Sequence, residues 1–179
     1  DVTKSIGTVS GSHGVGSDGS FGYTIPLYIP DGINGVQPSI SINYNSRGGN
    51  GMLGWGWDVS AFSAISLDNK GLYYDNSVAP MTLKGINNTF SLSGNKLSLT
   101  NGSFGYNGSE YRTFEEGDSK ISVSGTVAGC SSCPDKFIVQ TKSGLTIEYG
   151  GSASTRIANA DGIPLSWRIS KIKDLYGNY

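Results

Sequence analysis

The stretch FGYTIPLYIPDGINGVQPSISINYNS, residues 21–46, decides the fold class of this chain. Large apolar side chains occupy every second position between Phe21 and Ile29, and again between Ile40 and Tyr44. A period of two is typical of a strand that buries one face, so the stretch predicts two antiparallel strands. Residues that tolerate positive φ separate the two runs, as Asp31-Gly32 and Asn34-Gly35.

The same alternation recurs along the rest of the chain. It is found at residues 55–59, 65–67, 81–83, 90–92, 97–99, 121–123, 137–139 and 145–149. Short turn sequences around Ser93-Gly94 and Ser143-Gly144 predict tight hairpins between neighbouring runs. We therefore predict an all-β fold, an antiparallel meander of hairpins that forms a sandwich-like or shell-wall sheet with little or no helix. Residues 165–175 fit a short helix and a strand equally well.

Composition supports a globular β-protein. The 179 residues include 27 Gly, and only 15% are charged, which excludes a helical bundle rich in Ala, Leu, Glu and Lys. Ten Tyr, six Phe and three Trp suffice for a core, which excludes a disordered chain. We expect a flexible Gly/Ser-rich lead-in over residues 1–20 and one β-domain over residues 21–179. Pro26 and Pro30 predict that the first strand lies at a sheet edge.

Charge and hydropathy exclude two classes of partner. The net charge is −1 and the basic residues form no strong patch, which argues against a nucleic-acid partner. No apolar run approaches the roughly 20 residues that span a bilayer, so we predict no membrane span.

We expect no cofactor and no metal. Residues 14–19 and 49–54 match the spacing of a dinucleotide fingerprint, but neither stands between a strand and a helix, as that site requires. The only histidine, His13, lies in the Gly/Ser-rich lead-in, where nothing apolar anchors an imidazole for catalysis or metal binding.

Cys130 and Cys133 are the only cysteines. Their surroundings predict no helix of the kind that activates a redox pair. We expect a short disulfide that closes a loop in an oxidising compartment, with two free thiols as the alternative.

The acidic and the aromatic residues each allow a further functional interpretation. Glu110, Glu115 and Glu116 offer an acid–base pair of the kind that glycosidases use, but exposed turn positions explain them more simply. Trp55, Trp57 and Trp167 either fill the core or, with Asn and Asp nearby, form a carbohydrate-binding surface. We expect them to fill the core, with Trp55 and Trp57 on one face of one strand.

Residues 21–46, followed by GGNGMLGWGW at 48–57, resemble the start of the SpvB-like N-terminal region of toxin-complex B components and RHS (YD-repeat) proteins. That family's pattern reads iPi-x-x-P-G-x-x-G-x-x-P-x-L-s-l-x-Y-n-S, then G-N-G-x-L-G-x-G-W. Ile40 stands where the family often has Leu. Residues 111–114, 137–150 and 166–178 also resemble later family segments. Within these motifs we single out as structural positions Pro38, Tyr44, Gly51, Gly54, Trp55, Gly56, Trp57, Trp167, Asp174, Gly177 and Asn178.

The resemblance implies a piece of a much larger bacterial protein, secreted or at the cell surface. In that family the region precedes YD repeats that coil into a hollow β-shell around a C-terminal toxin, and it carries no catalytic residue. We therefore expect a non-enzymatic structural module. Its expected partners are the downstream shell of the same chain and other toxin-complex components, and a carbohydrate-binding or adhesive domain is the alternative.

Overall fold

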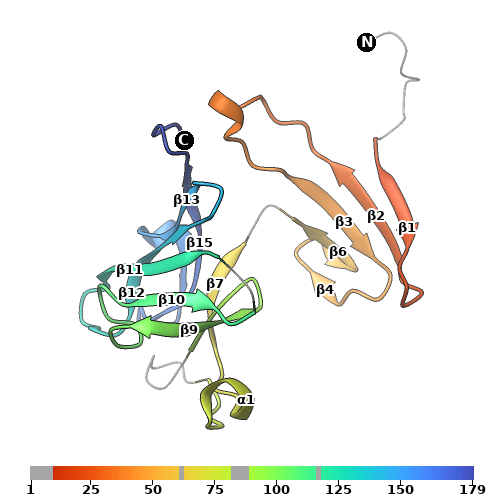
Figure 1. Cartoon of the computed structure of the whole chain (residues 1–179). Coiled ribbons are helices and arrows are strands. Elements are labelled where there is room, and N and C mark those ends of the chain that lie inside the picture. The colour runs from red at the N-terminus through yellow and green to blue at the C-terminus, as the bar shows by residue number, and fades with distance from the viewer. Residues whose placement is uncertain (1–9, 61–62, 82–88, 116–117) are drawn as a thin grey trace. The chain divides into compact units, whose positions relative to one another are not determined.

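The computed structural model describes residues 10–60, 63–81, 89–115 and 118–179. The chain divides between residues 62 and 63 into two compact units, and the described part is nearly all β (Figure 1). The β-domain predicted over residues 21–179 thus comprises residues of both compact units. The division could not be read from composition, because both units use the same short alternating strands.

The first unit is an antiparallel sheet in the order β1-β2-β3-β6. Its elements are β1 (Ser12–Val15), β2 (Phe21–Pro26), η1 (Ile33–Gly35), β3 (Ser41–Asn45), the small hairpin β4 (Asn50–Gly51) and β5 (Gly54–Trp55), and β6 (Trp57–Val59). β1 lies within the predicted flexible lead-in and pairs with β2 from Ser12–Thr24 to Val15–Phe21, which corrects that expectation for residues 12–15.

The predicted edge position of β2 is also wrong, because β2 lies between β1 and β3. Pro26 is tolerated there because it is the last residue of its strand and pairs only with Ser41 of β3. β1 reaches no further along β2 than Thr24, so no neighbouring strand on that side needs an amide hydrogen from residue 26.

The second unit is a closed antiparallel barrel of eight strands. Seven of them follow the chain order as a meander, and β15 closes the ring by pairing with both β7 and β13 (Figure 1). The strands are β7 (Ala64–Asp68), β8 (Thr89–Leu92), β9 (Asn95–Asn101), β10 (Glu110–Thr113), β11 (Lys120–Thr126), β12 (Pro134–Gln140), β13 (Thr146–Gly150) and β15 (Pro164–Lys173). A short α1 (Leu72–Asp75) follows β7, and η2 (Ala153–Thr155) and β14 (Arg156–Ala158) precede β15.

The predicted hairpins are confirmed. Ser93 and Gly94 both have positive φ between β8 and β9, which gives the turn the twist of the flanking strands. Residues 165–175, which fitted helix or strand, fall mostly in β15. The strand expected over residues 81–83 falls largely outside the described residues.

The barrel interior is filled with side chains, as expected for eight strands. Phe90, Phe137 and Trp167 pack edge to face, with ring centroids 5.0–5.6 Å apart. Nε1 of Trp167 donates a hydrogen bond to the carbonyl oxygen of Pro134 at 2.9 Å. The buried cluster consists of Ile65, Phe90, Leu97, Tyr111, Ile121, Val123, Phe137, Val139, Tyr149 and Trp167.

Replacing Trp167 with Ala is expected to lower the free energy of unfolding of the barrel by about 3–5 kcal/mol, because it leaves a cavity and an unpaired carbonyl. Replacing Trp55, which is 73% exposed, should cost less than about 0.5 kcal/mol. Urea denaturation of both variants checks this, and equal losses would contradict the assignment of the core.

Candidate functional site

The first unit carries one apolar and one polar sheet face. Directly paired residues project to the same face, and Tyr44 pairs with Tyr23 on one side and with Trp57 on the other. The opposite face presents short polar residues such as Thr24, Asn43 and Asp58. The apolar sheet face consists of Val15, Phe21, Tyr23, Ile25, Ile42, Tyr44, Trp57 and Val59.

A row of rings crosses this face. The centroids of Tyr44 and Trp57 lie 5.0 Å apart, and those of Phe21 and Tyr44 lie 6.4 Å apart. His13 continues the row, with its ring 6.3 Å from that of Phe21. The sole histidine therefore lies on strand β1 beside an apolar surface, rather than in a loose linker.

The described part of the first unit leaves this face only partly buried. Ser20 and Gly56 are the only residues of this unit with a described burial that are fully buried, so its described part contains no buried hydrophobic cluster. A sheet with one apolar face is stable when a second layer covers that face. The apolar sheet face is therefore the candidate interaction surface of the chain.

At two glycines of the 48–57 motif, any larger residue would clash with a neighbouring atom. A Cβ at Gly56, whose φ is +76°, would lie 2.7 Å from the ring of Tyr44. A Cβ at Gly51 would lie 2.2 Å from the carbonyl oxygen of Trp57. These contacts fold the β4–β5 hairpin back against β6, so the motif residues shape the sheet edge.

The expected shared face for Trp55 and Trp57 is wrong. Gly56 lies between β5 and β6, and its positive φ changes the direction of the chain there. The two indoles therefore lie on different strands. Trp55 is exposed on the β4–β5 hairpin, and Trp57 is half-buried in the ring row. The core role expected for the three tryptophans is confirmed for Trp167 and wrong for Trp55.

A family model described as SpvB, Salmonella virulence plasmid 65kDa B protein, matches residues 15–179, across both units. The chain belongs to the SpvB family. No curated protein matches the sequence.

Two solved structures share the fold of this SpvB-family chain. The structure titled TcdB2-TccC3 has a TM-score of 0.71 at 20% identity and covers 93% of this chain. The N-terminal domain of the effector protein SpvB from Salmonella typhimurium strain LT2 has a TM-score of 0.65 at 17% identity and covers 84% of this chain. The present chain spans 8% of the first protein and 50% of the second.

The C-terminal SpvB-family motif forms a closed turn after β15. The carboxylate of Asp174 accepts hydrogen bonds from the amides of Tyr176 and Asn178, each at 2.9 Å, and from Nδ2 of Asn178 at 2.7 Å. Gly177 supplies the positive φ that this geometry needs. Pro38, by contrast, is an exposed residue between η1 and β3. The carboxylate of Asp174 thus fixes the backbone of the turn that follows β15.

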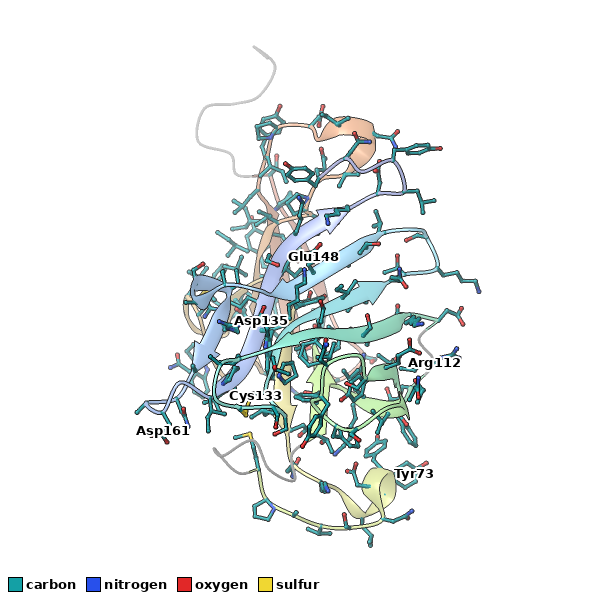
Figure 2. All side chains as sticks on the ribbon, turned by 90° about the vertical axis from the view of Figure 1, so that its left-hand side faces the viewer. Tyr73, Arg112, Cys133, Asp135, Glu148 and Asp161 are labelled. Atoms are coloured by element: carbon teal, nitrogen blue, oxygen red, sulfur yellow. A yellow bond between two sulfur atoms is a disulfide. The ribbon has the colours of Figure 1, made fainter. Side chains whose placement is uncertain are left out.

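The two cysteines are joined by a disulfide in the loop between β11 and β12 (Figure 2). Cys133 is buried and Cys130 is partly exposed. Pro134, which follows directly, is fully buried and accepts the hydrogen bond of Trp167. The disulfide loop therefore leads straight into the packing of the barrel core.

Five acidic side chains in the described part of the second unit form ion pairs with lysine or arginine. Glu110 pairs with Lys120 at 2.6 Å, and Asp135 pairs with Arg156. No group of three or more metal-ligating side chains exists in the part of the chain that is described. Nor does any helix there have the length and apolarity to cross a membrane. Glu115 is not drawn together with Glu110 by any hydrogen bond or ion pair, and Glu116 lies outside the described residues.

Glu148 is the acidic residue with the most complete pairing, and sequence reasoning did not single it out. Lys173 donates to one carboxylate oxygen at 2.6 Å and Lys136 to the other at 3.3 Å (Figure 2 labels Glu148). The hydrogen bond from Lys173 lowers the pKa of Glu148, with a further contribution from Lys136, and partial burial opposes the shift. The three strands β12, β13 and β15 are thereby tied at the point where the barrel closes.

The disulfide can be tested by thiol titration and by substitution of both cysteines. If the protein matures in an oxidising compartment, thiol titration of the unfolded chain without reductant should find no free thiol. Replacing both cysteines with Ser should destabilise the barrel by about 2 kcal/mol, since a short loop gains less than a long one. Two free thiols, with unchanged stability in the double variant, would leave the pair without a structural role.

The pairing of Glu148 makes the stability of the barrel depend on pH. Because the folded pKa of Glu148 lies below its unfolded value, its contribution to stability is fully present above the unfolded pKa, about 4.3. That contribution is lost as pH falls through the folded pKa. The stability difference between the wild type and Glu148→Gln should therefore be largest above about pH 5 and shrink in acid.

The control for this experiment is Asp118→Asn, which removes a pair with Lys142 whose side chains are both largely exposed. That change should alter stability by less than about 1 kcal/mol at any pH. A Glu148→Gln difference that stayed constant down to pH 2 would contradict the assigned pairing.

Proposed function

We propose that this SpvB-family chain is a non-enzymatic structural and protein-interaction module of a large exported protein related to toxin-complex and RHS proteins. In this proposal it contributes to a β-shell that encloses a C-terminal effector. The observation that carries the proposal is the apolar sheet face, which the described residues of the first unit leave only partly buried.

The character of that face favours a β-structured protein partner. Its aliphatic and aromatic residues alternate strictly with the polar face, as in a sheet that packs one side against a second layer. An apolar face of this kind on a folded chain marks a contact site for another protein surface. The partners proposed are further β-structure of the same protein and other toxin-complex components.

The barrel supports a structural rather than a catalytic role. Its interior holds packed aromatic rings. The carboxylates of Glu110, Asp135 and Glu148 are each held by a lysine or an arginine, which suits fixed ion pairs rather than proton transfer. The barrel thus serves as a rigid body to which other segments attach.

Export is proposed from two observations. A disulfide persists in an oxidising compartment such as the periplasm or the cell exterior. The matching family is named after a virulence plasmid protein, and the chain spans only a small part of the TcdB2-TccC3 protein. We therefore propose a bacterial protein, secreted or at the cell surface, of which these residues are one part.

A matched pair of charge substitutions tests the contact surface. Val15→Asp places a charge on the apolar sheet face of β1, and Ser12→Asp places the same charge on the opposite face of the same strand. Both residues are exposed, so both variants should fold. The chain would be expressed together with the remainder of its parent protein as a separate polypeptide, and the affinity of the two pieces measured.

Val15→Asp should weaken this association at least tenfold, and Ser12→Asp should change it by less than twofold. Hydrogen exchange of β1 and β2 amides should slow in the full-length protein relative to the isolated 179 residues. Equal effects of the two charges would contradict the assignment of the surface. A parent gene without YD repeats, or enzymatic turnover by the 179 residues that one carboxylate substitution abolishes, would contradict the function.

A further inference from the structure

A second surface lies on the barrel unit, where α1 meets β9 and β10. Tyr73 and Tyr74 of α1 contact Phe114, which follows β10, with ring centroids 6.2 Å and 4.6 Å from that of Phe114. Tyr73 is 81% exposed and Phe114 is 47% exposed. We call these three residues the aromatic cluster, and Figure 2 shows Tyr73 on α1 at this end of the unit.

A buried ion pair lies directly behind the aromatic cluster. Nζ of Lys96 lies 2.8 Å from Oδ2 of Asp75 and 5.7 Å from the centroid of the Tyr74 ring. The side chains of both charged residues are more than four-fifths buried. Oδ2 of Asp75 also accepts the amide of Gly71, and Lys96 also donates to the carbonyl oxygen of Asn69.

This pairing leaves one acceptor and one donor available. Every contact of Asp75 among the described residues uses Oδ2, so Oδ1 has no partner there. Lys96 has three N–H groups, of which Asp75 and Asn69 take two. A ligand can therefore receive a hydrogen bond from Lys96 and donate one to Asp75 at the same place.

Two hollows open beside these groups, and Tyr74, Lys96 and Phe114 line both of them. Their volumes are about 270 Å³ and about 220 Å³. Each is smaller than the roughly 300–1,000 Å³ of a pocket for a drug-sized ligand, so each suits a small ligand. The remaining polar lining includes Lys70, Asn76 and Ser98 in the first hollow, and Asp68, Asn69, Asn95 and Glu115 in the second.

We propose that this surface binds a neutral saccharide. Aromatic rings supply apolar surface for the C–H face of a pyranose, while the amides, Oδ1 of Asp75 and Nζ of Lys96 match its alternating hydroxyl groups. The proposal goes beyond the shell role and does not depend on it. It concerns a different unit and a different set of residues from the apolar sheet face.

The same features disfavour other ligands. An anionic ligand would meet Asp68, Asp75 and Glu115, which outnumber the two lysines of the lining. A quaternary ammonium would need an empty cage between the rings, but these rings contact one another and Lys96 already supplies the cation beside Tyr74. An apolar peptide would leave Oδ1 of Asp75 and the third N–H group of Lys96 without partners.

The test is a glycan array that carries neutral hexose and N-acetylhexosamine oligosaccharides beside sialylated and sulfated ones. It is probed with the 179-residue chain and with the variants Tyr73→Ala and Phe114→Ala. The matched control is Tyr176→Ala, which removes another exposed tyrosine, 83% exposed, from the turn after β15. Thermal unfolding of each variant confirms that the barrel remains folded.

We expect the wild type to bind neutral glycans, with a signal that falls at least tenfold in Tyr73→Ala and Phe114→Ala and by less than twofold in Tyr176→Ala. Isothermal titration with the strongest neutral glycan should give the same order of affinities. The proposal is overturned if no glycan binds, if only sialylated or sulfated glycans bind, or if the control loses as much binding as the cluster variants. None of these results bears on the shell role, which is tested through Val15.

Discussion

The pairing of β15 with both β7 and β13 is the interaction on which the second unit depends. Without it, the seven preceding strands would form an open meander with two unpaired edges. β15 also carries Trp167, the largest fully buried side chain, into contact with Phe90 and Phe137. One strand thus completes both the hydrogen-bond ladder and the core. The ion pairs of Glu148 with Lys136 and Lys173 also link β15 to β13 and β12.

The two units differ in how far they bury their apolar side chains. The barrel hides its apolar side chains by closing on itself, so its stability is internal. The four-stranded sheet has the same alternation, but its described residues provide no second layer over Phe21, Tyr44 and Trp57. A partner that bound only the folded form of this sheet would stabilise it.

Local features of this fold were predictable, and long-range ones were not. The period of two and the turn at Ser93-Gly94 report on near neighbours, so they predicted strands and hairpins correctly. Nothing within residues 164–173 indicates that they join residues 64–68, so barrel closure was missed. Trp55 was misplaced because the φ of Gly56 changes the chain direction, and a regular alternation assumes constant dihedral angles. The cluster around Tyr73 was missed because α1 is too short to show a helical period.

β7 and β15 pair with each other but lie far apart in the sequence, so the barrel can close only after β15 has been synthesised. The hydroxyl of Ser166 donates to the carbonyl oxygen of Ile65 across 101 residues, and β7 is synthesised long before β15 exists. Until β15 leaves the ribosome, Ile65 and Phe90 have no closed interior to occupy, and the edges of β7 and β13 are exposed to other chains. Such late, non-local pairing slows folding and prolongs the period in which aggregation competes with it.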